Sequence, residues 1–392
     1  MLSNRHGVAL ITTLWILAAL VILALGIGLM ARTEAQVSYN FAGLVQCRWA
    51  ARAGINRALV EIENLKEQST TYLQESGLVF TSEQDQIDLG EASFEVLIQD
   101  EAGRININSA PAAVLENLFG SRDVCDCIID WRDANDEPRP LGAETQYYSG
   151  LTEPYRCKNK PFDTIRELLL VKDVTEEMLS SPVGGGDKTL ADMLTAYSHD
   201  ENTTVDGEER INIQTASKED LKSKLGDTLT DEDIDAIIRY RERRSFRRAA
   251  DVIRVRDLGR DKVSAIYDRL TVRTGSGGRN SGSNKNRIAG LVNVNTAPVE
   301  VLAALPGMDQ GIAMELVQYR QSNGPFEDVG KILNVAGLTD TAFAQAADRM
   351  TVRSRVFRIT ATGRLEKSRV SCKIECVVDA SGDQVQTKYW RE

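Results

Sequence analysis

The chain has 392 residues and a formal net charge of −10, from 47 Lys and Arg against 57 Asp and Glu. This balance provides no general attraction for nucleic acid or anionic lipid, and the length allows two or more folded units. The histidines are His6 and His199, so a histidine-based metal site or a Ser-His-Asp triad would have to use His199.

The first predicted element is the uncharged segment from Val8 to Met30. A helix of this length spans roughly 34 Å, about the thickness of a bilayer core. The run is too long for a secretory signal peptide, and a poor cleavage sequence follows it. Because Arg5 precedes the segment, the positive-inside rule places the N-terminus in the cytoplasm and everything after Arg32 across the membrane, where disulfides are allowed.

Apolar residues recur at spacings of three and four beyond the membrane segment, which predicts one long helix from about Val8 to Gln68. From the pattern alone, this helix is equally well explained as a membrane anchor with a stalk. Two later segments alternate as strands do: "SFEVLIQDEAGRININ", and, near the C-terminus, "RVFRITATGRLEKSRVSCKIECVVD", which predicts a hairpin.

Between these strands one pattern occurs three times, as "RININSAPAAVL", "RINIQTASKEDL" and "LVNVNTAPVEVL". Each copy predicts a helix, with its N-cap at Ser109, Thr215 or Thr296. A second helix, a phenylalanine and a third apolar segment follow in every copy; the phenylalanines are Phe162, Phe246 and Phe326. The first copy carries an insertion before its phenylalanine, and the run "TGSGGRNSGSNKNR" predicts a flexible linker between the second and third copies.

The third copy, "LPGMDQGIAMELVQYRQSNGPF", resembles a helix-hairpin-helix unit of the kind that binds DNA phosphates through backbone amides. Acidic residues at these turns would repel phosphate: Asp309 lies in the third hairpin, and "TDEDID" in the second copy. The basic cluster "RYRERRSFRR" is the one opposing signal, and we expect it to pair with local acids or a protein partner. No nucleic-acid partner is therefore expected, and a membrane-anchored DNA-binding or DNA-uptake protein is the alternative. A periplasmic hydrolase is a third hypothesis, for which no nucleophile lies beside a base.

The insertion of the first copy begins with the acid-rich run "IIDWRDANDEPRPLGAE". Oxygen ligands at alternate and nearby positions of a turn suit Ca²⁺. The run is not an EF-hand loop, however, and acid-rich turns are commonly just solvated, so the residues leave both interpretations open.

Several of these strings together resemble type II secretion system protein K, a minor pseudopilin: "VALITTLWILAAL" after Gly7, "DEAGRININSAP", "DWRDANDEPRPLGAE", "YYSGLTEPYRCKNKPF" and the closing "YWR". The resemblance is close from Arg5 to about Val183 and looser in the C-terminal strands, while the third helical copy is extra relative to the usual family length. It implies an α+β fold, in which a long N-terminal helix packs on a small antiparallel sheet and a large helical domain of helix-hairpin-helix-like repeats is inserted between strands.

The resemblance also implies a function without enzymatic activity: initiating and capping the secretion pseudopilus by binding other minor pseudopilins and the major pseudopilin. Prepilin peptidase would cut between Gly7 and Val8 at the inner membrane, leaving a single-pass chain with its main body in the periplasm. Thr12 takes the fifth position after the cut, where related pilin-like chains usually have Glu. The family's association with calcium implies a site formed by Asp133, Asn135, Asp136 and Glu144, with Asp130 in a second ligand shell.

The predicted organisation along the chain has nine segments. They are a leader (1–7), a transmembrane segment (8–30), its periplasmic continuation (31–70), first strands (71–108), a first helical unit with the acidic insertion (109–199), a second unit (200–274), a linker (275–289), a third unit (290–350) and C-terminal strands (351–392).

The six cysteines are too few for a disulfide framework to hold a chain of this size. Cys372 and Cys376 are four residues apart on a predicted strand, roughly 13 Å, which is too far to bridge. Cys125 and Cys127 point to different faces of a predicted helix. If a disulfide forms in the first unit, we expect it to join Cys157 to one of that pair; buried, reduced cysteines are the alternative.

Overall fold

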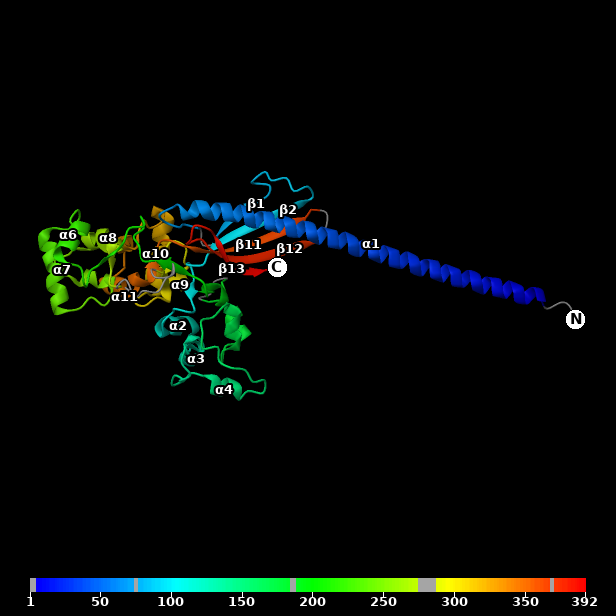
Figure 1. Cartoon of the computed structure of the whole chain (residues 1–392), viewed down its shortest axis with the longest axis horizontal. Helices are drawn as coiled ribbons and strands as arrows, with labels where there is room; N and C mark the ends of the chain where they lie inside the picture. The colour runs from blue at the N-terminus through cyan, green and yellow to red at the C-terminus, as the bar shows by residue number, and fades with distance from the viewer. Residues whose placement is uncertain (1–4, 74–76, 184–187, 274–286, 367–369) are drawn as a thin grey trace.

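A computed structural model of the chain describes residues 5–73, 77–183, 188–273, 287–366 and 370–392, with side chains of the first helix from Leu10 onward. The long helix α1 (Arg5–Lys66) extends away from the rest of the molecule over its N-terminal part (Figure 1). Its apolar window has a mean hydropathy of 2.7 and is not buried, and within the described residues this is the one helix long and apolar enough to cross a membrane.

The C-terminal part of α1 packs on a five-stranded antiparallel sheet (Figure 1). The strand order is β1 (Leu78–Thr81), β2 (Ala92–Asp100), β11 (Val356–Leu365), β12 (Ser371–Asp379) and β13 (Gln386–Arg391). Apolar residues of one α1 face, including Ile55, Ala58 and Ile62, are buried against the sheet's inner face. The predicted fold class, a long helix on a small antiparallel sheet with an inserted helical domain, is confirmed.

The described residues between β2 and β11 form the inserted helical domain, in three units that each close with a parallel strand pair. The pairs are β3 (Ile105–Asn106) with β4 (Leu194–Thr195), β6 (Ile211–Asn212) with β7 (Leu270–Thr271), and β9 (Val292–Asn293) with β10 (Met350–Thr351). The first unit contains α2 (Ala112–Phe119), α3 (Arg122–Arg132), α4 (Thr145–Ser149), η1 (Ile165–Leu170), α5 (Glu176–Ser180) and η2 (Ala191–Met193).

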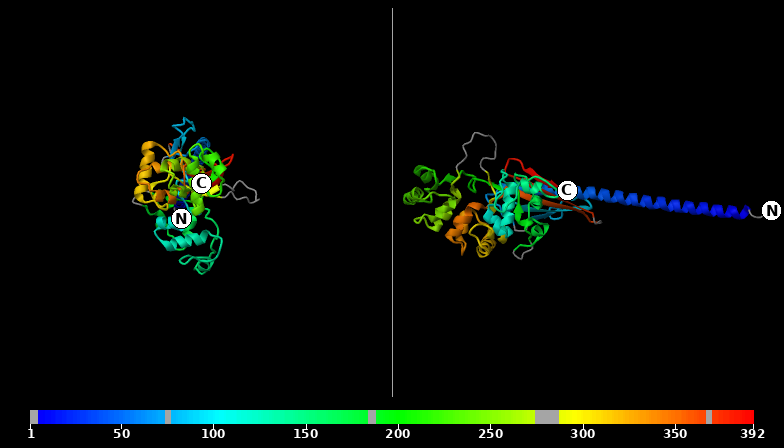
Figure 2. Two further views of the ribbon diagram at one scale, coloured as in Figure 1. Left: turned by 90° about the vertical axis from the view of Figure 1, so that its left-hand side faces the viewer. Right: turned by 90° about the horizontal axis from the view of Figure 1, so that it is seen from below.

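The second and third units have the same order of elements without the insertion. The second contains α6 (Lys218–Leu225), α7 (Asp231–Arg243), η3 (Ala249–Arg254), α8 (Arg260–Ile266) and η4 (Tyr267–Arg269). The third contains α9 (Val299–Ala303), α10 (Gln310–Asn323), η5 (Val329–Asn334), α11 (Asp340–Ala346) and η6 (Ala347–Arg349). The two units pack reciprocally, α8 on η5 and α11 on η3, and they lie beyond the C-terminal end of α1 (Figures 1 and 2).

Each unit begins with a turn, and its first helix starts only after that turn. The side-chain oxygens of Asn106, Asn212 and Asn293 accept the backbone N–H two residues later, at 2.8, 2.9 and 3.0 Å. The predicted N-caps at Ser109, Thr215 and Thr296 are therefore wrong, because these residues lie inside the turn. The helices begin two residues later, and their N-cap residues are Pro111, Ser217 and Pro298.

A second repeated contact explains the phenylalanine of each copy. The side-chain oxygens of Asn108, Gln214 and Asn295 accept the backbone N–H of Phe162, Phe246 and Phe326, at 2.7, 2.7 and 2.8 Å. All three phenylalanines are buried. This hydrogen bond joins the start of each unit to the segment after its second helix, so the sequence repeat is also a structural repeat.

The structure corrects two predicted segment boundaries. Ile105 and Asn106, assigned to the first strands (71–108), pair with β4 inside the first helical unit. Of the predicted linker (275–289), residues 275–286 lie outside the described residues, and β8 (Arg287–Ala289) pairs with β5 (His199–Glu201). The pairing is explained by Ile288, which is buried, and by Arg287, whose Nη1 lies 3.4 Å from the Asp379 carboxylate.

Candidate metal centre

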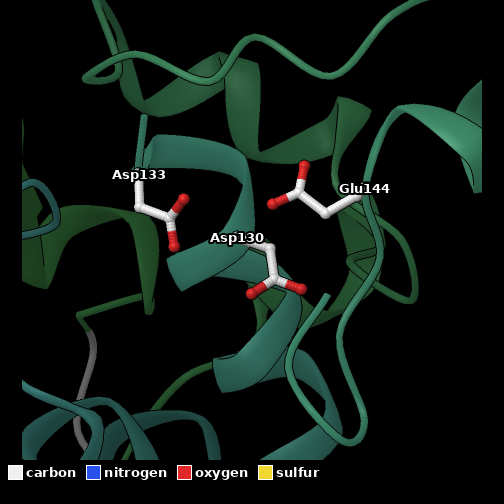
Figure 3. Close-up of side chains that lie close together, drawn as sticks. All are labelled: Asp130, Asp133 and Glu144. Atoms are coloured by element: carbon white, nitrogen blue, oxygen red, sulfur yellow. The ribbon is translucent and has the colours of Figure 1, made fainter. Parts of the chain in front are cut away.

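Three carboxylates converge where α3 ends and the insertion of the first unit begins. Asp130 is in the last turn of α3, Asp133 is its C-cap residue, and Glu144 is the N-cap residue of α4. One oxygen from each lies within 4.8 Å of the other two. The side chains of Asp133 and Glu144 point toward each other, and the Asp130 carboxylate lies below the gap between them (Figure 3).

Glu144 is the most constrained of the three. The residue is 3% exposed, and neither Oε1 nor Oε2 has a hydrogen-bond partner. Burial raises the pKa of Glu144 to about 7, and the neighbouring Asp130, Asp133 and Asp136 raise it further. A buried acceptor pair without donors is costly, so this position favours a cation.

Asp130 is fixed by the chain that returns toward it. It is fully buried, and the backbone N–H of Arg139 donates to its Oδ2 at 3.1 Å. A Cβ on Gly142 would lie 1.8 Å from the same oxygen, so only glycine lets the loop approach this closely. Burial raises the pKa of Asp130, and Asp133 adds to the effect. Among the described residues, Arg139 forms an ion pair with Asp130, in which its Nε lies 3.8 Å from Asp130 Oδ1.

The structure brings together two of the four predicted ligands, Asp133 and Glu144, and adds Asp130, which the resemblance placed in a second shell. The other two make hydrogen bonds within the loop. The Asn135 side-chain oxygen accepts the N–H of Glu137 at 2.8 Å, and Asp136 Oδ1 accepts the N–H of Thr145 at 3.2 Å.

The sequence reasoning missed Asn159. Its Nδ2 donates to the carbonyl of Asn135 at 2.8 Å, while its Oδ1 is buried without a partner. Its φ of 48° is in the left-handed region, which Asn tolerates better than most residues. The partnerless Oδ1 makes Asn159 a further candidate oxygen ligand. The quoted run "YRCKNKPF" contains it, but nothing local relates it to the acidic run.

This donor set consists of carboxylate and amide oxygens. Such ligands suit a hard cation, and Ca²⁺ takes six to eight of them in flexible geometry. The residues present therefore fit the implied ion, and its charge would stabilise the ionised forms of Asp130 and Glu144.

In the structure Cys125, Cys127 and Cys157 are buried free cysteines, which is the alternative to a disulfide of Cys157 with Cys125 or Cys127 that the sequence left open. The thiol of Cys127 points to the Leu141 carbonyl at 3.5 Å, and that of Cys157 to the Asp130 carbonyl at 3.9 Å. The two thiols therefore contact backbone on either side of the acidic loop instead of each other.

The remaining predicted positions lie in α1. Gly7 and Val8 are within the helix, and the side chain of Val8 is not among those described. Thr12 is on the exposed surface of the apolar segment.

In the second and third units, acidic residues lie at the N-terminus of the helix that follows the hairpin turn, where a DNA phosphate would bind. Asp309 caps α10 and accepts the N–H of Ile312 at 2.8 Å. In the second unit the cap of α7 is Thr230, followed by Asp231, Glu232 and Asp233. An anionic ligand would meet negative charge at both places.

Comparison with known proteins gives two family matches. Residues 103–181 match the model described as "Type II secretion system (T2SS), protein K", and residues 288–351 match "Helix-hairpin-helix motif". The first match contains the whole carboxylate cluster. The second confirms the interpretation of the third unit.

Among curated proteins, endonuclease/exonuclease/phosphatase family domain-containing protein 1 of Mus musculus is 27% identical over 168 residues, which cover 38% of this chain and 28% of that protein. An uncharacterized protein of Neisseria meningitidis serogroup A is 43% identical over 56 residues, covering 14% of this chain and 7% of that protein. The chain thus spans little more than a quarter of the first relative and a small part of the second.

Among solved structures, a chain of the GspK-GspI-GspJ complex from the type II secretion system of enterotoxigenic Escherichia coli aligns with 92% of this chain and 98% of its own length. The TM-score is 0.49 and the sequence identity 13%. The match at residues 103–181 confirms the resemblance to type II secretion system protein K that the sequence predicted.

Proposed function

We propose that the chain is a minor pseudopilin that initiates and caps a type II secretion pseudopilus by binding other minor pseudopilins. The observation that carries the proposal is the protein K domain on the same chain as α1. Its family is a component of a secretion system, and the proposed role is assembly without catalysis.

The exposed surface of α1 supports this role. Large apolar side chains such as Leu14, Ile22 and Met30 are each more than two-thirds exposed. Such a surface is stable only in lipid or against other apolar helices. The same segment can therefore anchor the chain in the inner membrane and later pack among the helices of a fibre.

Two features favour a position at the tip. The second and third units lie at the end of the molecule opposite the N-terminus of α1 (Figure 1), where they would obstruct a subunit stacked beyond them. Thr12 carries no charge, so a subunit with no neighbour ahead of it avoids an unpaired carboxylate, which costs about 2.5 to 3.5 kcal/mol in a membrane on insertion scales.

The assembly role is tested on full-length chain extracted from membranes after crosslinking. We expect mass spectrometry to identify other pseudopilins in the crosslinked species and the mature N-terminus to be Val8. Gly7→Val should block processing, whereas Gly28→Val should not, because a Cβ at Gly28 contacts nothing within 4 Å. A mature N-terminus at Met1, or label distributed along the fibre, would overturn the proposal.

We also propose that Asp130, Asp133, Glu144 and Asn159 bind Ca²⁺. Bound ion stabilises the folded state by mass action, by about 2.7 kcal/mol at a hundredfold excess over Kd. The melting temperature of the full chain in detergent should therefore rise with added Ca²⁺ and fall with chelator. Glu144→Gln should abolish the response, and Glu153→Gln, at an exposed residue of the same insertion, should retain it. An unchanged melting temperature in wild type would contradict the site.

A further inference from the structure

The second and third helical units enclose a cavity of about 400 Å³ that no role proposed above uses. Residues of both units line it, including Ala249 and Tyr267 from the second and Val329 and Gln345 from the third. Five arginines also line it: Arg210, Arg247, Arg248, Arg273 and Arg349. This concentration of positive charge occurs in a chain whose net charge is −10.

Local acids neutralise these arginines only in part. Arg210 pairs with Asp268 at 2.7 Å, and Arg248 lies 3.9 Å from Asp251. No ion pair within the described part of the chain engages the other three. The acid that lines the cavity, Asp348, accepts the N–H of Ala250 and the hydroxyl of Tyr267, and its charge offsets part of the positive charge of Arg248 and Arg349.

The arginines are close enough to repel one another. Burial lowers the pKa of Arg349, and Arg248 and Arg273 lower it further, against the opposing effect of Asp348. Arg210 also has a buried Nε without a hydrogen-bond partner. Packing does not require this arrangement, since Arg247 and Arg273 are exposed. An anion in the cavity would relieve the repulsion and accept the free N–H groups.

The rest of the lining selects among anions. Leu270, Val272, Ile288, Leu291 and Met350 form apolar parts of the wall. A free phosphate would leave this surface unused, and an extended polyanion would meet the acids Glu208 and Glu209, exposed directly before Arg210. A short peptide with carboxylates beside apolar side chains satisfies both parts of the cavity, whose volume lies within the usual range for ligand sites.

We propose that this arginine-lined cavity binds a carboxylate-bearing peptide segment of a partner protein, with apolar side chains next to the carboxylate. The carboxylate belongs either to acidic side chains or to a chain terminus. The site is separate from the carboxylate cluster and from α1, so it does not depend on the proposed position in the fibre.

The test uses the full chain in detergent and short peptides carrying an uncharged fluorophore. An amidated peptide alternating Glu and Leu presents side-chain carboxylates, and a peptide alternating Gln and Leu with a free C-terminus presents a terminal one. The fully uncharged amidated Gln and Leu peptide is the control. We expect one of the carboxylate peptides to bind, with affinity falling as salt is added.

The variant Arg247→Gln/Arg273→Gln should weaken binding about tenfold or more, because each lost arginine removes charge-assisted hydrogen bonds. The matched double variant Arg243→Gln/Arg256→Gln removes the same charge from exposed positions that do not line the cavity, and should bind as wild type does. Equal binding of the uncharged peptide, or equal loss in both double variants, would overturn the proposal. So would tighter, cavity-dependent binding of a single-stranded oligonucleotide or of inorganic phosphate.

Discussion

Burial, and not pairing, determines the chemistry of the thiols in the first helical unit. Cys125, Cys127 and Cys157 are buried in one apolar cluster. Burial raises their pKa values to about 12, 11 and 12, and nearby acids add to the effect. Because the thiolate is the reactive form, these residues should be inert toward electrophiles in the folded chain.

Iodoacetamide at pH 8 should therefore alkylate Cys372, the one partly exposed cysteine, before any other, while the three thiols of the first unit react only after denaturation. Peptide mapping by mass spectrometry with and without prior reduction distinguishes the possibilities. Recovery of Cys157 in a disulfide with Cys125 or Cys127 would restore the pairing expected from the sequence.

At the scale of elements, the contact between α1 and the sheet depends on close backbone approach. A Cβ on Gly363 of β11 would lie 1.9 Å from the backbone oxygen of Cys47, and one on Gly54 would lie 3.0 Å from the Phe94 ring. In the first contact the backbone fixes the position of the Cβ, and its neighbour is a backbone oxygen, so no change of side-chain rotamer can relieve the clash. The strand alternation that predicted β11 gives no sign that one of its residues must be glycine.

Gly363→Ala should consequently destabilise the full chain by about 2 kcal/mol or more, because inserting a methyl group into a close-packed contact forces the helix and the strand apart. The measurement is the melting temperature in detergent. Gly259→Ala is the matched control, because its Cβ would meet nothing within 4 Å and its φ is −69°. A Gly363→Ala chain that melts with the control would show that α1 can shift freely on the sheet.

At the scale of the whole molecule, two consecutive acids at the end of β2 connect the sheet to the helical units. Asp100 accepts hydrogen bonds from Asn293 at 2.8 Å and Thr296 at 2.6 Å, both in the third unit. Glu101, which is fully buried, accepts from Arg358 of β11 at 2.7 Å and Arg104 at 3.1 Å, and from Thr195 of the first unit. These bonds hold two helical units against one end of the sheet.

Glu101 should make this junction sensitive to acid. Burial opposes its ionisation, but Arg104 and Arg358 outweigh burial and hold the pKa of Glu101 below its ordinary value. Its stabilising effect is thus fully present above the unfolded pKa of about 4.3 and is lost as the pH falls through the lower folded value.

Glu101→Gln should lower stability at pH 7 by about 3 kcal/mol, because it leaves two arginines without their buried partner. The difference in melting temperature from wild type should shrink as the pH falls below about 4.3, where the carboxylate protonates in the unfolded chain while the folded chain still holds it ionised. Glu95→Gln, at an exposed residue of the same strand, should change little. Equal effects of the two substitutions would exclude a special role for the buried junction.

The candidate metal site was predictable in part. The acidic run after α3 was visible in the sequence, and it supplies Asp130, Asp133 and Glu144. Which acids converge depends on how the loop returns past Gly142. Asn159, whose backbone is in the left-handed region, is distant in the sequence from the acidic run, so its candidacy as a ligand depends on the fold. Side-chain spacing in a loop does not fix these distances, because the loop has no regular period.

Elements with local patterns could be predicted from the order of side chains alone: the long apolar helix, the alternating strands, the three repeated units and the acidic insertion. Their periods of 3.6 and 2 residues are present directly in that order. The start of each repeat helix, the pairing of β8 with β5, the free state of the thiols and the grouping of arginines between the second and third units became visible in the folded chain alone. These features arise from contacts between distant segments, whose energies depend on packing and burial that no local pattern records.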